Sequence, residues 1–195
     1  MTSGLLQVLA DAVPATLWRN GGGSTRELLT RPSNADWRLR ISLADIERDG
    51  PFSNFPGTQR WFAVVAGAGV RLRFASSEHI VTADSAALRF DGAAAPECEL
   101  LDGSTRDLNL MLREGSAALQ RVQPEATWDD AFAERGLFTL CAGDLHSEAD
   151  GITTLAPFTL VWYLRPGACR FMPRSEGRAG WWLGWSDAPQ QGASS

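Results

Sequence analysis

Residues 37–43 read Trp37-Arg38-Leu39-Arg40-Ile41-Ser42-Leu43. Apolar side chains alternate with polar ones, and successive side chains of a β-strand point to opposite faces of its sheet. The stretch therefore predicts a strand with one apolar face and one face that carries Arg38, Arg40 and Ser42. On an antiparallel sheet such a polar face usually contacts water. In a barrel it can point into the lumen, where an arginine needs a paired group or an anion.

The same alternation recurs along the chain on both sides of this strand. An apolar run at 60–66, a Gly-Ala-Gly turn and alternating residues at 70–74 predict a hairpin. Further strands are expected at 26–30, 79–83, 86–90, 97–101, 108–113, 118–122, 136–142, 151–154, 157–164 and 180–185. Only residues 128–134 suggest a short helix. Many short strands with almost no helix predict an all-β sandwich or barrel.

The domain organisation follows from a break in this pattern. Glu114-Gly115 interrupts the strands and suggests two stacked β units, but the Pro/Ser-rich composition of a linker is missing there. We expect one compact body, with residues 5–113 in the first unit and 114–187 in the second. The tail, 188–195, is expected to be disordered. The tryptophans near the C-terminus are expected to close the bottom of the second unit; they are Trp181, Trp182 and Trp185.

Composition excludes several classes of function. The chain has 195 residues, 18 Lys and Arg against 23 Asp and Glu, and a formal net charge of −5; all the basic residues are arginines. Without lysine there is no Schiff-base or pyridoxal-phosphate enzyme and no P-loop phosphate site. Nucleic-acid binding needs a positive face, and here the arginines are scattered among carboxylates. We therefore expect no nucleic-acid partner.

The cysteines and the chain start bear on the compartment. Cys98, Cys141 and Cys169 are odd in number and form no CxxC motif, so neither a disulfide framework nor a zinc site is indicated. The first residues lack the basic and apolar regions of a secretory leader, and the sequence has no apolar run long enough to span a membrane. A cytoplasmic protein without a membrane partner is predicted.

The most unusual segment is Trp18-Arg19-Asn20-Gly21-Gly22-Gly23-Ser24-Thr25-Arg26-Glu27. Three successive glycines could form an anion-binding nest of backbone amides, or simply a tight corner or β-bulge. On spacing alone the two readings are equally good. An aromatic wall, a guanidinium and an amide at Trp18, Arg19 and Asn20 favour a binding site.

Other polar residues could join that site. If the strands at 37–43 and 108–113 turn their polar faces inward, Arg40 and Ser42 converge with Asn109 and Met111 on one cavity. Between these strands, Phe52 and Phe55 lie in a predicted loop and either cap the core or form a lid. For Arg106-Asp107 we expect a structural ion pair at a strand start rather than a catalytic acid.

Several motifs together resemble the HutD family, which also contains the stress-induced protein Ves. They cover about residues 5–113 in the family's order: Trp18-Arg19-Asn20-Gly21-Gly22-Gly23, Thr25-Arg26-Glu27, Trp37-Arg38-Leu39-Arg40-Ile41-Ser42, Gly50-Pro51-Phe52-Ser53, Phe55-Pro56-Gly57, Phe90-Asp91-Gly92 and Arg106-Asp107-Leu108-Asn109-Leu110-Met111. The resemblance implies a bicupin, with two small jelly-roll β-barrels. It also implies that the HutD branch restrains expression of histidine utilisation by binding an intermediate such as N-formylglutamate or urocanate.

This sequence fits a metal-free version of that fold. Metal-dependent cupins use an HxH pair before the first hairpin turn, and His79 and His146, the only histidines, do not supply it. We therefore expect no metal and no cofactor. The predicted function is binding of a small carboxylate, as a sensor or negative regulator, without catalysis. The predicted ligand-binding residues are Trp18, Arg19, Asn20, Arg40, Ser42, Asn109 and Met111, with Phe52 and Phe55 as lid or loop.

Two alternatives stay open at this point. A metal-free isomerase or amidohydrolase could use Asp107 or Glu27 as general base beside an arginine. A protein-interaction module of a stress response would instead fill the lumen of its barrel with side chains. The chain is expected to be a monomer or a homodimer.

Overall fold

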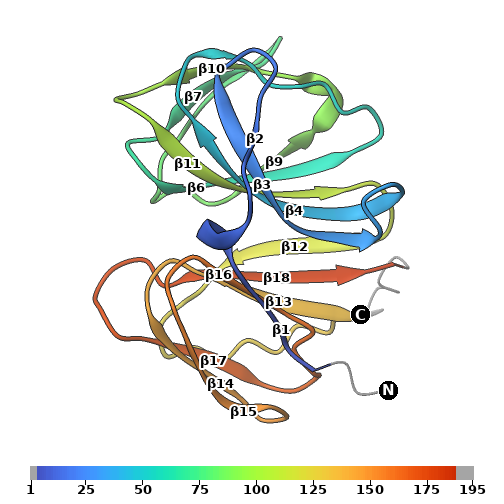
Figure 1. The fold of residues 1–195 in the computed structure, drawn as a ribbon, viewed down its shortest axis with the longest axis vertical. Helices are drawn as coiled ribbons and strands as arrows, with labels where there is room; N and C mark the ends of the chain where they lie inside the picture. The colour runs from blue at the N-terminus through green and yellow to red at the C-terminus, as the bar shows by residue number, and fades with distance from the viewer. Residues whose placement is uncertain (1–3, 188–195) are drawn as a thin grey trace. The chain divides into compact units, whose positions relative to one another are not determined.

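The computed structural model describes residues 4–187. The chain forms two β-rich units, one of residues 13–113 and one that combines residues 4–12 with residues 114–187 (Figure 1). Each unit is built from two facing antiparallel sheets. The all-β prediction is confirmed. Among the described strands, the two sheets of a unit remain separate rather than hydrogen-bonded into one closed barrel.

The unit of residues 13–113 contains a six-stranded and a four-stranded sheet. The larger sheet runs in the order β2 (Thr16–Leu17), β3 (Gly23–Pro32), β4 (Trp37–Ile46), β11 (Thr105–Leu112), β6 (Gln59–Ala66) and β9 (Leu88–Asp91). The smaller sheet runs in the order β5 (Gly50–Pro51), β10 (Glu97–Leu100), β7 (Val70–Arg73) and β8 (Glu78–Val81).

The two faces of the larger sheet differ in chemistry. One face carries aliphatic side chains that are completely buried: Leu39, Ile41, Leu43, Leu108 and Leu110. The other face is divided along its width. Towards β6 it packs on the smaller sheet through a core of Ile46, Phe52, Phe62, Val64, Val70, Leu72, Val81, Ala83 and Cys98. Towards β3 and β4 it is polar. Burying a side chain such as Phe62 stabilises the fold by about 1.5–3 kcal/mol.

The second unit has a five-stranded and a three-stranded sheet. The larger runs in the order β1 (Leu6–Leu9), β16 (Thr159–Trp162), β13 (Glu134–Thr139), β18 (Gly180–Ser186) and β12 (Ser116–Arg121); the smaller runs in the order β15 (Gly151–Leu155), β14 (Gly143–Ser147) and β17 (Cys169–Pro173). Between them lies a core that includes Trp128 and Trp182, whose rings stack 4.9 Å apart.

The tryptophans of β18 are buried, as expected, but they do not form one cap. Trp181, Trp182 and Trp185 are 1%, 3% and 6% exposed. Neighbouring residues of a strand point to opposite faces, so Trp181 lies on the face of β18 opposite to Trp182. Only Trp182 belongs to the core between the two sheets of this unit.

Three expectations from the sequence need correction. The helix predicted at 128–134 is wrong, because Trp128 forms a β-bridge with Cys169 and Glu134 already begins β13. The first unit does not begin at residue 5, since β1 pairs with β16. The strands expected from the sequence also omit β14 and β17. The tail predicted to be disordered, 188–195, lies outside the described residues.

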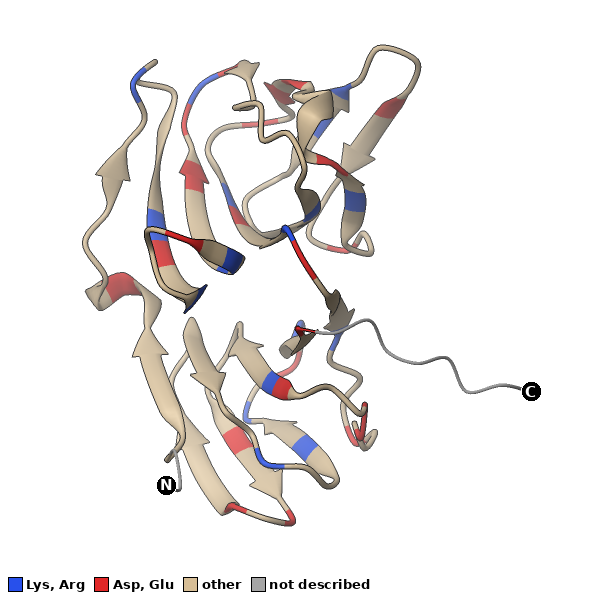
Figure 2. Ribbon diagram, turned by 90° about the vertical axis from the view of Figure 1, so that its right-hand side faces the viewer, with Lys and Arg blue, Asp and Glu red and all other residues tan. Residues whose placement is uncertain are grey.

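The helical content is two short 3-10 turns, η1 (Ala10–Ala12) and η2 (Gly92–Ala94), within the described range. Accordingly, residues 4–187 contain no helix long and apolar enough to cross a membrane. Figure 2 shows basic and acidic residues interspersed along the strands of each unit. On the smaller sheet of residues 13–113 they form a ladder of ion pairs, in which Arg71 and Arg73 each pair with both Glu78 and Glu99.

Candidate functional site

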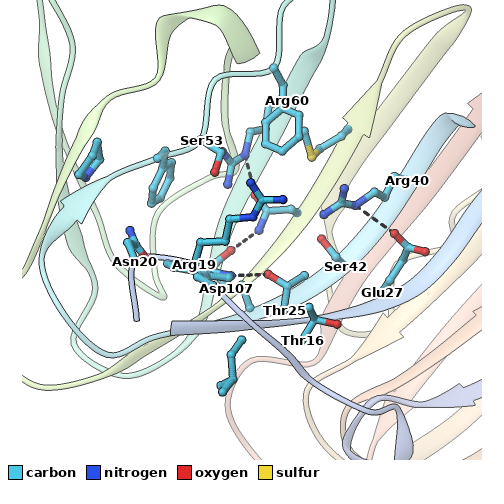
Figure 3. Close-up of a pocket in the computed structure, with 18 residues that line it drawn as sticks. Thr16, Arg19, Asn20, Thr25, Glu27, Arg40, Ser42, Ser53, Arg60 and Asp107 are labelled. Carbon is cyan, nitrogen blue, oxygen red and sulfur yellow. Dashed lines mark hydrogen bonds and ion pairs between the residues drawn. The ribbon is translucent and has the colours of Figure 1, made fainter. Parts of the chain in front are cut away.

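A cavity of about 640 Å³ lies on the polar part of the larger sheet in the unit of residues 13–113. Its floor comes from β3, β4, β6 and β11, and its rim from the segments before β3 and after β5 (Figure 3). The lining residues are Thr16, Leu17, Trp18, Arg19, Asn20, Thr25, Glu27, Arg40, Ser42, Ala44, Pro51, Phe52, Ser53, Phe55, Arg60, Asp107, Asn109 and Met111.

The strand register arranges the floor in rows. In the first row Arg40 of β4, Met111 of β11 and Arg60 of β6 are direct neighbours. Since adjacent strands are about 4.8 Å apart, the two arginines start from backbones about 10 Å apart, close enough for both side chains to reach one ligand. The polar faces of β4 and β11 therefore meet, as the sequence predicted if both strands turned inward.

The next two rows explain why there is a cavity at all. The second row is Ser42, Asn109 and Phe62, and the third is Ala44, Asp107 and Val64. On the β6 side large apolar residues fill the space against the smaller sheet. On the β4 side the residues are small, and Thr25 of β3 stands beside Ala44. The missing side-chain volume on this side becomes the cavity.

A buried chain of hydrogen bonds crosses the floor of the cavity. Arg60 Nε donates to Asn109 Oδ1 at 2.8 Å, and Asn109 Nδ2 donates to Asp107 Oδ2 (Figure 3). Arg60, Asn109 and Asp107 are 9%, 3% and 1% exposed. Arginine and aspartate are almost never this buried without a partner, and here a neutral amide stands between the two charges.

Burial shifts the ionisation of both ends of this chain. The Arg60 guanidinium lies 4.5 Å from the centre of the Phe52 ring and 5.5 Å from that of Phe90. Loss of hydration lowers the pKa of Arg60 to about 10, although the charge of Asp107 opposes this shift. Burial likewise raises the pKa of Asp107 to about 7, against the effects of Arg60 and Asn109. Arg60 therefore stays charged at neutral pH, whereas Asp107 is close to the midpoint of its titration there.

Asp107 also has an oxygen without a partner. Oδ2 accepts from Asn109, but the described residues offer Oδ1 no hydrogen bond although that atom is buried. A buried polar atom left in this state costs about 1–3 kcal/mol. Asp107 also lines the cavity, so a ligand bound there could supply the hydrogen-bond partner that Oδ1 lacks.

Arg40 is the second cation of the floor. Its Nε lies 3.5 Å from Glu27 Oε2, too far for a strong hydrogen bond, and Nε has no hydrogen-bond partner in the described part of the chain. Burial lowers the pKa of Arg40, an effect that Glu27 opposes and Arg113 adds to. A loosely paired, half-buried guanidinium can exchange its partner for a ligand carboxylate.

The three glycines form the turn that brings the rim residues to the cavity. Trp18 N donates to Gly23 O at 2.9 Å, Gly21 N to Trp18 O at 3.0 Å, and Gly22 N to Asn20 Oδ1 at 3.0 Å. A side chain at Gly23 would meet Asp45 O at 2.1 Å, so only glycine fits there. The amides of Gly21 and Gly22 are thus used inside the turn, which favours the corner reading over the anion nest.

The other rim residues have distinct surroundings. Trp18 is half-buried, and its Nε1 donates to Thr25 Oγ1 at 2.7 Å. Arg19 and Asn20 are exposed. Phe52 belongs to the core, with its ring 5.5 Å from Phe62, so it is a wall rather than a lid. Phe55 is only half-buried and lies 5.9 Å from Arg40.

All nine residues named from the sequence line this one cavity, while ligand binding by them stays a prediction. The predicted ion pair of Arg106 with Asp107 is wrong. The two residues point to opposite faces of β11, and Arg106 Nε donates to Asp45 Oδ1 at 2.7 Å. Arg60 is a lining residue that was not named from the sequence, because it stands at the start of an apolar run. The feature that could have shown it is a charged residue at an inward-facing position of that strand. Asp107 was named as one half of the ion pair with Arg106 and as a general base in the enzyme alternative, not among the ligand-binding residues.

The second unit contains a smaller hollow of about 430 Å³, lined in part by His146, Glu148 and Arg170. All three are exposed. Asp144 of β14 forms an ion pair with Arg174, in which Oδ1 lies 2.8 Å from Nη2. Within residues 4–187 there is no group of three or more His, Cys, Asp or Glu side chains that could hold a metal ion.

Comparison with known proteins follows the same lines. The family model HutD matches residues 10–179. A 21.2 kDa protein in the hutC 3' region of Pseudomonas putida is 39% identical over 131 residues, 64% of this chain and 65% of the relative. Protein Ves of Escherichia fergusonii is 32% identical over 126 residues, again 64% and 65% of the two chains. The matched region thus spans just under two thirds of these relatives.

Solved structures show the same fold. A conserved protein of unknown function from Pseudomonas aeruginosa PAO1 has a TM-score of 0.80 and 29% identity over 94% of this chain and 99% of its own. HutD from Pseudomonas fluorescens SBW25, in a formate condition, has a TM-score of 0.80 and 21% identity over 94% and 98%. A cupin 2 barrel protein from Leptotrichia buccalis has a TM-score of 0.57 at 9% identity over 93% and 96%. The predicted bicupin fold is confirmed.

Proposed function

This chain belongs to the HutD family, and we propose that it binds a small carboxylate metabolite in the cavity of residues 13–113, without a metal, as a sensor or negative regulator of histidine utilisation. The observation that carries the proposal is Arg60. Arg60 is 9% exposed and lines a cavity of about 640 Å³, and its Nε donates a hydrogen bond to a neutral amide, that of Asn109. A buried cation beside an open space favours an anion there.

The arrangement suits a carboxylate in particular. Guanidinium groups are planar and can make two parallel hydrogen bonds to one carboxylate. Arg40 and Arg60 lie on either side of Met111 in the first row of the floor, and the exposed Arg19 lies at the rim. Each carboxylate of a dicarboxylate could therefore bind an arginine. The apolar parts of Met111 and Phe55 supply contacts for a short carbon chain between them. N-formylglutamate is such a dicarboxylate, whereas urocanate has one carboxylate and would use one of these cations.

The regulatory part of the proposal rests on relatives. One is described by its position in the hutC 3' region, and a structural neighbour is named HutD. Action in the cytoplasm, as a monomer or a homodimer, completes the proposal, and the free thiols of Cys98, Cys141 and Cys169 suit a reducing compartment. A protein-interaction module with a side-chain-filled lumen is disfavoured by the cavity.

Thermal unfolding with candidate ligands tests the binding. N-formylglutamate, urocanate or formiminoglutamate at a hundredfold excess over its dissociation constant should stabilise the folded protein by about 2.7 kcal/mol. For Arg40→Ala and for Arg60→Gln, we expect the same stabilisation to require at least about ten times more ligand, because buried charged hydrogen bonds to the ligand are lost. The same variants should fail to restrain expression of histidine-degrading enzymes in cells.

Controls separate the proposal from its alternatives. Arg174→Gln changes an exposed arginine of the second unit that pairs with Asp144, and it should leave the ligand response intact. Ligand recovered unchanged after long incubation with chelator-treated protein supports binding without catalysis, whereas a product supports the enzyme alternative. Lack of stabilisation by all three ligands would contradict the proposal.

A further inference from the structure

Two acidic residues, Asp107 and Glu27, line the cavity, and Asp107 is the buried one. An anionic ligand in the cavity comes close to it. Asp107 occupies the third row, one row beyond Asn109 and two rows from the arginines. Its neighbour across β4 is the small residue Ala44, and the Asp107 side chain is part of the cavity lining. A second negative charge brought into this buried site would repel an ionised Asp107.

The charged and titratable groups around Asp107 come from several strands. Arg60 on β6 attracts it, Asp45 on β4 repels it, and Cys98 on β10 interacts with it. Burial raises the pKa of the Cys98 thiol to about 12, so the thiol is neutral at neutral pH. The remaining charges of the cavity are Arg40 on β4, Glu27 on β3 and Arg19 at the rim.

Hydrogen bonding decides which oxygen of Asp107 can hold a proton. Oδ2 accepts from Asn109 Nδ2, so it acts as an acceptor. Oδ1 is buried, without a partner among the described residues, and belongs to a side chain that lines the cavity. As an ionised oxygen it would stay unpaired beside an anion, whereas as a hydroxyl it would donate to one.

We propose that Asp107 binds the ligand as a neutral carboxylic acid whose Oδ1 donates a hydrogen bond to a ligand oxygen, so that wherever Asp107 is ionised in the ligand-free protein, the anion enters the cavity together with one proton. The proton comes from solvent and stays on Asp107 in the complex. This inference rests on the proposed function, since it assumes that the cavity binds a carboxylate. It adds a selective element: a ligand with only donor groups at this position, such as an ammonium, is rejected.

Proton uptake can be measured directly by calorimetric titration of the wild-type protein with N-formylglutamate in phosphate and in Tris buffer. The ligand is fully ionised between about pH 6 and about pH 8.5, and Arg60 stays charged throughout. The difference in binding enthalpy between the two buffers gives the number of protons taken up. At the alkaline end of this range we expect that number to be close to one. The dissociation constant should rise about tenfold for each pH unit above about 7.

Asp107→Asn keeps a hydrogen-bond donor at this position but cannot titrate. We expect it to bind N-formylglutamate with an affinity that no longer depends on pH and without proton uptake. Asp144→Asn, the same change on the exposed surface of the second unit, should leave the wild-type pH dependence unchanged. If Asp107→Asn does not fold, the two-buffer measurement on the wild type decides alone.

Each outcome has a distinct meaning. Binding with no proton uptake, or affinity that increases with pH, would overturn the role of Asp107 and leave the carboxylate site standing. Affinity that increases with pH would indicate that ionised Asp107 accepts from a donor group of the ligand. Failure to bind at both ends of the pH range would contradict the proposed function itself.

Discussion

The two units each bury an arginine in a β-strand beside an aromatic ring, but the two arginines have different partners. Arg135 of β13 is 2% exposed, lies 4.6 Å from the Trp128 ring centre, and donates to the backbone carbonyls of Arg165, Gly167 and Trp128. Arg60 of β6 lies over Phe52, and its Nε donates to the side chain of Asn109.

This difference separates a structural arginine from a candidate binding arginine. Backbone carbonyl groups hold Arg135 in place, and their fixed dipoles stabilise its charge. Arg60 is held by a side chain and faces a cavity, so its charge can act on a ligand. The aromatic residues show the same contrast: Trp128 stacks on Trp182 inside the second unit, while Trp18 stands at the rim of the cavity.

The largest expected effect is on the filled interior of the second unit. Trp128→Ala should lower the free energy of unfolding by about 3–5 kcal/mol, because a buried ring is lost and a void is left beside Trp182. Trp18→Ala should cost less than about 1 kcal/mol and weaken ligand-dependent stabilisation instead. Urea unfolding with and without ligand measures both. Equal losses of stability would break the contrast between the two units.

A smaller effect is expected from the buried arginines. Arg135→Met should destabilise the protein by about 2–4 kcal/mol, since three carbonyl groups lose their donors. Arg60→Met should cost only about 1–2 kcal/mol, because one amide loses its donor and Asp107 can take up a proton. The same denaturation series compares them. A larger cost for Arg60→Met would show that Arg60 is primarily structural.

The smallest effect concerns Asp107 in the ligand-free protein. Its pKa is about 7 in the folded state against 3.8 for a free aspartate, so the folded state binds the proton more tightly. This contribution to stability is fully present below about pH 4 and is lost as the pH rises through 7. Asp107→Asn should remove this loss, on the order of 1–3 kcal/mol, and be more stable than wild type at about pH 8. Parallel pH profiles for the two proteins would contradict a buried, titrating Asp107.

The sequence alone was sufficient to place many of the strands and nine residues that line the cavity. Alternation at 37–43 and 108–113 was sufficient to place β4 and β11, because a strand with one buried face must alternate. It also placed Arg40 with Ser42 on one face of the first strand and Asn109 with Met111 on one face of the second, while only the register of β4 and β11 shows that these two faces coincide. The lack of alternation at 128–134 hid a β-bridge, because local pattern does not show pairing with Cys169, which is distant in the chain.

Only the tertiary structure decided which charges meet. Which of the two consecutive residues Arg106 and Asp107 shares a face with Arg60 depends on the register of β11 with β4 and β6, because one residue of shift would exchange the two faces. The cavity likewise arises from small side chains of β3 and β4 that become neighbours only in the sheet. The ionisation of Asp107 depends on burial by segments distant in sequence, so the composition that excluded lysine chemistry could not reveal it.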